Sequence, residues 1–188
     1  MRSFQIHNDI KKILFSKEEI EGIVKRIGKE ISDDFRNSDK RLLLVCILKG
    51  SLIFTSDLMR AIDIPCEVDF MQASSYGDKT ISNGTVHIRL DLKVQDLSKY
   101  NIVIIEDILD TGNTLYNLIH ILKGKGCDDV RLCVLLNKPD RRKRDISVHY
   151  EGAKIPDEFV VGYGLDYDDV YRNLPYIGVL KPEVYENK

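Results

Sequence analysis

One acidic segment of the sequence combines residue types that could bind and transform a phosphorylated ligand: residues 102–114 read IVIIEDILDTGNT. Glu106 and Asp107 follow four β-branched residues, so we predict them at the carboxyl end of a buried strand, where open α/β sheets bind ligands. The residues after them form a short turn into a helix; they are Asp110, Thr111, Gly112, Asn113 and Thr114. Such a turn points N–H groups and hydroxyls outward, and the helix dipole adds positive charge. The turn therefore predicts a site for a phosphate monoester, which Gly112 lets approach closely.

Three carboxylates so close to a phosphate would repel it, but they make sense if the ligand also carries hydroxyls and a metal. Carboxylates accept hydrogen bonds from ribose hydroxyls and help to hold Mg²⁺. A phosphorylated ribose satisfies both needs. Either half of the segment alone would favour a purely structural explanation, namely a strand followed by an acidic turn with threonine as a helix cap. The complete pattern Glu-Asp-x-x-Asp-Thr-Gly-x-Thr is far more specific.

The elements that must position this segment follow from the hydrophobic periodicity. Ser16 and Glu19 have the spacing of a capping box, and apolar residues behind them predict a helix to about Phe35. A second helix is predicted at 52–62, and a third follows the acidic turn and ends at Gly124 and Gly126. Strands are predicted at 42–48, 67–73, 85–91, 101–105, 130–136, 159–161 and 177–180. This order predicts a single α/β domain over residues 1–188, with a mainly parallel sheet flanked by helices.

Composition limits the classes of protein. The 188 residues carry a net charge of −2, which argues against a nucleic-acid-binding protein. The basic run at 138–144 is typical of a solvated face. No secretory signal pattern or membrane-spanning segment is recognisable. The four cysteines form no CxxC pair, so we expect reduced thiols and a cytoplasmic protein.

The acidic segment resembles the phosphoribosyl pyrophosphate motif of the type I phosphoribosyltransferases, and residues 42–180 resemble the hypoxanthine-guanine branch of that family. The resemblance implies the family fold, with a small hood formed by the two terminal segments. It implies transfer of a phosphoribosyl group to a 6-oxopurine with Mg²⁺, in a homodimer or homotetramer. Asp110 is then the acid–base residue that exchanges a proton with purine N7.

The resemblance also gives roles to residues that look ordinary by themselves, such as a strand-end lysine or a hairpin tip. The 48–51 loop, with a cis peptide between Leu48 and Lys49, is expected to bind pyrophosphate, and residues 74–84 are expected to form a lid. The expected pyrophosphate ligands are Lys49, Gly50, Ser75, Tyr76 and Arg172. The expected purine-site residues are Lys138, Phe159, Val160 and Asp166, with Lys138 donating to the 6-oxo group. The expected metal ligands are Glu106, Asp107 and Asp166.

One position departs from some relatives, because Asn113 replaces a lysine of the phosphate turn and removes a cationic contact. A non-catalytic regulator on the same fold is one alternative, but it would not need Asp110, Lys49 and Arg172. An enzyme on another nucleotide fold is a second, but no P-loop or complete GxGxxG fingerprint is present. The preference among hypoxanthine, guanine and xanthine is left open.

Overall fold

The computed structural model describes residues 6–75, 86–127 and 129–186. The helices are α1 (Lys17–Phe35), α2 (Leu52–Ala61), α3 (Asn113–Gly124) and α4 (Pro182–Tyr185). The strands are β1 (Ile10–Phe15), β2 (Arg41–Ile47), β3 (Cys66–Ser75), β4 (Val86–Leu90), β5 (Tyr100–Leu109), β6 (Val130–Asn137), β7 (Tyr150–Lys154), β8 (Val160–Val161) and β9 (Ile177–Leu180). Short 3₁₀ segments cover Ile6–Asp9, Leu97–Lys99 and Pro139–Arg141.

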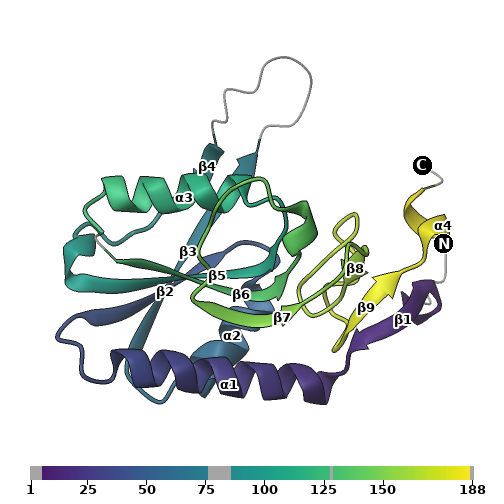
Figure 1. Cartoon of the computed structure of the whole chain (residues 1–188), viewed down its shortest axis with the longest axis horizontal. Coiled ribbons are helices and arrows are strands. Elements are labelled where there is room, and N and C mark those ends of the chain that lie inside the picture. Colours follow the sequence, from purple (N-terminus) through teal and green to yellow (C-terminus); the bar gives the residue numbers. More distant parts are fainter. Residues whose placement is uncertain (1–5, 76–85, 128, 187–188) are drawn as a thin grey trace.

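The larger sheet has six strands in the order β4-β3-β2-β5-β6-β7. Every neighbouring pair is parallel except β3 with β4. Helices α1 and α2 lie on one face, and α3 lies on the other (Figure 1). The predicted α/β class with a mainly parallel sheet is therefore confirmed.

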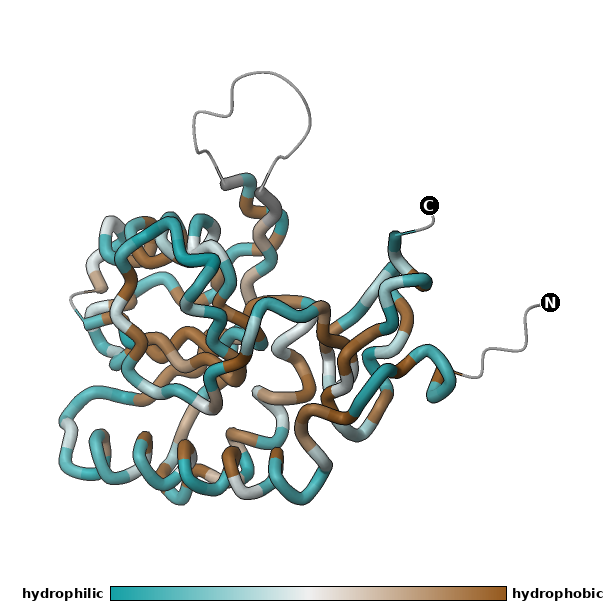
Figure 2. The backbone as a smooth tube through the Cα atoms, turned by 45° about the vertical axis from the view of Figure 1, so that its right-hand side comes forward, coloured by the Kyte–Doolittle hydropathy of each residue, from teal (hydrophilic) through white to brown (hydrophobic). Residues whose placement is uncertain are grey.

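Apolar side chains alternate between the two faces of this sheet, as strand geometry requires. Leu42 and Leu44 of β2 pack with α1 and α2, whereas Leu43 and Val45 pack with α3. Figure 2 shows that the hydrophobic residues are concentrated in the interior segments and the hydrophilic residues in the outer ones. Continuous apolar strands are thus buried on both faces, which is why 42–48 was recognisable as a strand.

The amino end of α1 has the predicted capping box. The Ser16 hydroxyl accepts from the Glu19 backbone N–H at 3.2 Å, and the Glu19 carboxylate accepts from the Ser16 N–H at 2.7 Å. Both helix-end donors are thereby satisfied. The apolar face of α1 then covers the sheet down to Phe35, where the helix was expected to end.

A smaller sheet, which we call the hood, is formed by β1, β9 and β8 in antiparallel order. It brings residues from both ends of the chain together beside the carboxyl ends of the large sheet (Figure 1). Its own apolar cluster includes Val161, Leu174 and Leu180. That all 188 residues form one domain stays a prediction.

Three strands differ from expectation. β5 was expected to end at Ile105 but continues to Leu109, because β6 continues beside it and pairs with Ile108 and Leu109. β1 and β7 were not expected at all. The β1 sequence IKKILF contains two lysines, and the β7 sequence YEGAK contains a glycine and two charged residues. Their partners β9 and β6 make these segments strands, which local sequence does not reveal.

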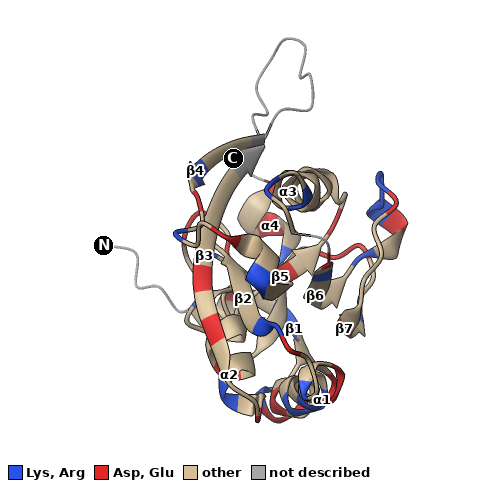
Figure 3. Ribbon diagram, turned by 90° about the vertical axis from the view of Figure 1, so that its left-hand side faces the viewer, with Lys and Arg blue, Asp and Glu red and all other residues tan. Residues whose placement is uncertain are grey.

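Positively and negatively charged residues are interspersed in the view of Figure 3, which shows no large region of a single sign. Among the described residues, no helix is long and apolar enough to cross a membrane.

Candidate active site

The acidic segment lies at the carboxyl edge of the large sheet, as predicted, beside a cavity of about 250 Å³. The cavity walls come from the ends of β2, β3 and β5 and from the start of α3. Their residues are Ile47, Leu48, Ala73, Glu106, Ile108, Leu109, Asp110, Thr111, Gly112, Asn113, Thr114 and Leu115. One cavity thus contacts every residue of the predicted phosphate turn.

The amino end of α3 has the geometry of an anion site. Gly112 is the cap residue with φ of 82°, a conformation that glycine adopts without strain. No side chain caps the helix. The first N–H groups of a helix have no backbone partner within it, and at α3 the Asn113 N–H makes only a long contact, of 3.5 Å, with the Thr111 hydroxyl. A ligand phosphate at this helix end would therefore face weakly satisfied donors.

A segment at 141–146, which we call the basic strap, packs against this turn. Arg142 Nε donates to the Asp110 carbonyl at 3.2 Å, and the Lys143 N–H donates to the Thr111 carbonyl at 2.9 Å. Arg144 Nε donates to the Asn113 side-chain oxygen at 3.0 Å. The 138–144 run was expected to be a solvated face, and Arg141, Lys143 and Arg144 are exposed, but Arg142 is half-buried and Lys138 is buried. That interpretation also missed the contacts of the strap with the turn.

The strap also explains why position 112 has no side chain. A Cβ on Gly112 would lie 2.9 Å from the Ile146 Cδ1 atom of the strap. The turn is therefore enclosed by the strap on one side and by the cavity on another.

Asp110 belongs to a chain of charged groups that reaches Lys138. Its carboxylate pairs with Arg141 at 3.2 Å, and Arg141 also pairs with Asp157 at 3.4 Å. Asp157 contacts the Lys138 ammonium at 3.5 Å. Lys138 is only 7% exposed although it follows a strand end, so it is not the solvated lysine that such a position usually carries. The expected acid–base residue and the expected 6-oxo donor are thus connected through two intermediates.

Glu106 and Asp107 form a closely coupled pair of carboxyl groups. Burial raises the pKa of Glu106 well above its usual range, and the charge of Asp107 raises it further. Burial also raises the pKa of Asp107, whose carboxylate accepts from the Ile108 N–H at 2.8 Å. Burial and the proximity of the two groups suppress their ionisation, and a bound cation would restore the carboxylate form, which also accepts hydrogen bonds from hydroxyl groups.

This oxygen-only donor set fits Mg²⁺. Among the described residues, no three His, Cys, Asp or Glu side chains gather into a complete metal site. Mg²⁺ commonly binds one or two carboxylates and completes its shell with water and substrate phosphate, so a complete protein site is not required. Asp166, the third expected ligand, lies in the hood, where it pairs with Arg172 at 2.8 Å.

The expected pyrophosphate loop is in direct contact with Asp107. The Leu48–Lys49 peptide is cis, as expected. Gly50 lies against Asp107 so tightly that a Cβ would be 1.6 Å from its Oδ2 atom. Gly164 of the hood approaches from the other side, where a Cβ would be 2.1 Å from the Gly50 carbonyl oxygen. The two glycines allow the hood, the loop and the carboxylate pair to meet.

We expect Gly50→Ala to destabilise the protein, because the added methyl group must displace Asp107 or the loop. Overpacking of this kind costs about 1–3 kcal/mol, which lowers the melting temperature by several degrees. Gly22→Ala is the matched control, since a Cβ there contacts nothing within 4 Å and alanine favours the α1 interior. Calorimetric melting of both variants checks this, and a Gly50→Ala protein as stable as Gly22→Ala would contradict it.

Lys49 and Arg172, the expected pyrophosphate cations, are brought together by a residue that had no assigned role. Asp169 contacts the Lys49 ammonium at 2.9 Å and the Arg172 guanidinium at 3.0 Å. The hydrogen bond from Lys49 lowers the pKa of Asp169. Arg172 also donates to the Gly164 carbonyl at 2.8 Å. The neighbouring acidic residues Asp168 and Asp169 were visible in the sequence, but nothing local indicated their partners.

The remaining predicted residues lie partly in the hood. Phe159 is 38% exposed, and Val160 is buried in β8 against Val179. The backbone of Ser75 ends β3 and pairs with Val86, but its side chain is outside the described part of the structure. Tyr76 and the rest of the expected lid, 77–84, also lie outside the described residues.

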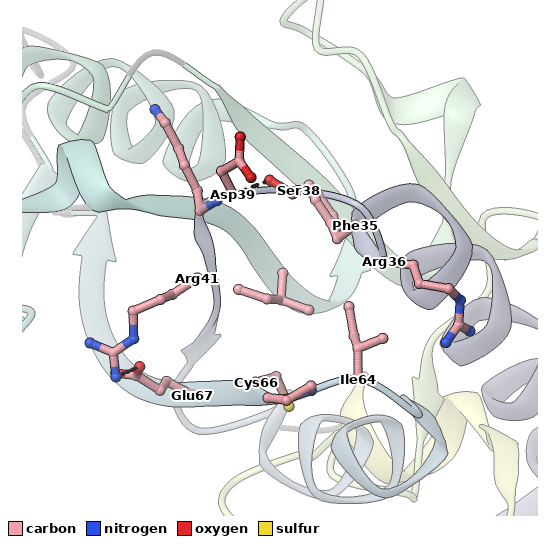
Figure 4. A pocket seen from close by; sticks show the side chains of 11 residues that line it. Phe35, Arg36, Ser38, Asp39, Arg41, Ile64, Cys66 and Glu67 are labelled. Atoms are coloured by element: carbon pink, nitrogen blue, oxygen red, sulfur yellow. Dashed lines mark hydrogen bonds and ion pairs between the residues drawn. The ribbon is translucent and has the colours of Figure 1, made fainter.

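A second cavity, of about 530 Å³, lies at the opposite edge of the sheet, where β2 and β3 begin (Figure 4). Arg41 and Glu67 point toward each other across it and form an ion pair. Arg36 at its rim pairs with Asp63 at 2.8 Å. None of the predicted site residues contributes to this cavity.

Comparison with known proteins identifies the family. Residues 12–168 match the family model described as phosphoribosyl transferase domain. Hypoxanthine-guanine phosphoribosyltransferases of Staphylococcus aureus and Staphylococcus epidermidis are each 49% identical, covering 97% and 96% of this chain and 100% and 99% of their own lengths.

Two solved structures give the same result. A crystal structure of a hypoxanthine phosphoribosyltransferase from Staphylococcus aureus has a TM-score of 0.91 at 48% identity, covering 98% of this chain and 99% of its own. A Trypanosoma cruzi hypoxanthine phosphoribosyltransferase in a ternary substrate complex has a TM-score of 0.88 at 40% identity. That similarity covers 95% of this chain and 99% of the other.

Proposed function

Because the chain belongs to the phosphoribosyl transferase domain family, we propose that it transfers 5-phosphoribosyl from phosphoribosyl pyrophosphate to hypoxanthine and guanine, releasing pyrophosphate. The observation that carries the proposal is the uncapped amino end of α3, beside the carboxylate pair at the carboxyl edge of the sheet. A phosphorylated ribose needs an anion site with acceptors for its hydroxyl groups nearby. The product is a purine nucleotide, which places the protein in purine salvage.

In the proposed complex, the turn at 111–114 binds the ribose 5-phosphate through its backbone N–H groups and the Thr111 and Thr114 hydroxyls. Glu106 and Asp107 accept hydrogen bonds from the two ribose hydroxyls. Asp110 adjoins both the phosphate turn and the Arg141–Asp157–Lys138 chain of charges. Its position supports a role in removing the proton from purine N7 as the new bond to the anomeric carbon forms.

The purine site is proposed to lie between Lys138 and the hood. Lys138 donates to the 6-oxo group, Phe159 stacks on the ring, and the Val160 backbone binds the ring edge. Adenine carries an amino group where these purines carry an oxygen, so it would leave the Lys138 donor unpaired. An unpaired buried donor is costly, which gives the selection its physical basis.

The leaving pyrophosphate is proposed to bind Lys49, Gly50 and Arg172, with Ser75 and Tyr76 closing over it. Lys49 and Arg172 share Asp169 as a partner, so both cations are close to each other before any ligand arrives. Pyrophosphate, with its higher charge, would replace Asp169 as their partner.

Mg²⁺ is the proposed cofactor, held by Glu106, Asp107 and Asp166 together with substrate oxygens. When bound, it neutralises charge on the departing pyrophosphate. The protein would supply carboxylate oxygens as metal ligands and hold them beside the 48–51 loop. We also propose a cytoplasmic homodimer or homotetramer.

The test is a spectroscopic assay of each purine base with phosphoribosyl pyrophosphate and Mg²⁺. Nucleotide formation with hypoxanthine and guanine, and little with adenine, is expected. Absence of product with every base would contradict the proposal. Tight binding of substrates without turnover would instead support the alternative of a non-catalytic regulator, which no described feature of the site favours.

A further inference from the structure

An aromatic cluster in the hood surrounds Phe159, the ring proposed to stack on the purine. The Phe159 and Tyr185 rings are stacked, with centroids 4.9 Å apart and planes inclined by 23°. Tyr167 meets Phe159 edge-on, with centroids 5.6 Å apart at 88°. Tyr167 and Tyr185 also contact each other at 6.4 Å. These separations and angles are those of favourable aromatic pairs.

Phe159 stays 38% exposed although two rings pack on it. An aromatic ring has two faces and an edge. Tyr185 stacks on one face and Tyr167 contacts the ring at right angles, so a further planar partner would reach Phe159 through its exposed part. Tyr167 and Tyr185 themselves are partly buried against the apolar cluster of the hood, which fixes their positions.

The backbone also ties Phe159 to the C-terminal segment. The Leu180 N–H at the end of β9 donates to the Phe159 carbonyl at 2.8 Å. The next residue, Lys181, donates its N–H to the Asp9 carbonyl at 2.9 Å, and α4 then begins at Pro182. The residues just before α4 are thus bonded to the Phe159 backbone and to the amino-terminal segment, and Tyr185 is the last residue of the helix.

We propose that Tyr185 is a positioning residue for the purine base: it holds the Phe159 ring in the orientation that stacks on the purine, so that α4 contributes to base affinity. This inference rests on the proposed function, in particular on the stacking role of Phe159. A ring fixed before the ligand arrives loses less rotational freedom on binding. The base then completes a stack in the order Tyr185, Phe159, purine.

The test compares Tyr185→Ala and Tyr185→Phe in steady-state kinetics. Because the interaction free energy of an aromatic pair is lost, Tyr185→Ala should raise the KM for hypoxanthine by about threefold to tenfold. The KM for phosphoribosyl pyrophosphate and the kcat should change little, because neither the phosphate turn nor Asp110 is touched. Tyr185→Phe keeps the ring and should restore the wild-type KM for hypoxanthine.

Tyr176→Ala is the matched control, because it removes another hood tyrosine whose hydroxyl contacts His7 at 2.7 Å. Thermal melting shows whether each variant is folded. Tyr176→Ala should leave both KM values unchanged. The inference is overturned if Tyr185→Ala leaves the KM for hypoxanthine unchanged, or raises the KM for hypoxanthine and the KM for phosphoribosyl pyrophosphate equally. A lowered KM would also overturn it, because Tyr185 would then cover the face that the purine needs. A wild-type protein that forms no nucleotide from any base would instead defeat the proposed function.

Discussion

Asp110→Asn should reduce kcat by about 10²- to 10⁴-fold, the range that a positioned acid–base group contributes. The amide has the size of the carboxylate, so the turn should keep its shape. Arg142 binds the Asp110 backbone carbonyl, and the Lys143 N–H binds that of Thr111; neither contact involves the substituted side chain. The amide cannot take a proton from purine N7, which is the reason for the loss.

The lost ion pair with Arg141 should matter little for stability, because both side chains are more than a third exposed and such pairs contribute little. Binding of phosphoribosyl pyrophosphate, measured by calorimetry, should therefore stay close to that of the wild type. Asp140→Asn, an exposed neighbour of the strap, is the control for a changed charge nearby. Full turnover in Asp110→Asn would rule out the acid–base role, and an equal loss of substrate binding would point to a disrupted turn.

The sequence predicted the features of the molecule that depend on residues close together in the chain. The α1 capping box, the doubly buried strands and the phosphate turn each depend on a few consecutive residues, and each lies where it was expected. The carboxyl-edge position of the turn followed from sheet topology, because parallel strands place their carboxyl ends at one edge. The resemblance added the cis peptide before Lys49, which no periodicity could predict.

Contacts between distant segments were not predictable in the same way. Asp169 lies 120 residues from Lys49, and Tyr185 reaches Phe159 through the pairing of β8 with β9. The basic strap shows the limit most clearly. Its composition correctly indicated exposed side chains, but its backbone contacts with the Thr111 turn depend on where β6 ends relative to β5.

Lys138→Gln should change which base the protein accepts, and this is the second-largest effect we expect. A hydrogen bond from a charged donor is worth about 1.5–3 kcal/mol, so kcat/KM for hypoxanthine and guanine should fall by roughly 10- to 150-fold. A glutamine amide has both a donor and an acceptor, so it can turn either group toward the base. Discrimination against adenine should therefore weaken, whereas the KM for phosphoribosyl pyrophosphate should stay nearly unchanged.

The fold should tolerate this substitution. Lys138 is 7% exposed, but its partner Asp157 is about half exposed and stays solvated and paired with Arg141 when the ammonium is removed. The Lys138 N–H still donates to the Leu109 carbonyl at 3.0 Å, which keeps the strand ends of β5 and β6 together. Lys154→Gln, at the exposed end of the neighbouring strand β7, loses the same charge and should leave base selection unaltered. If Lys138→Gln kept the wild-type ratio of kcat/KM for hypoxanthine over adenine, base selection would have to come from the hood, because no described contact of Lys138 would then explain it.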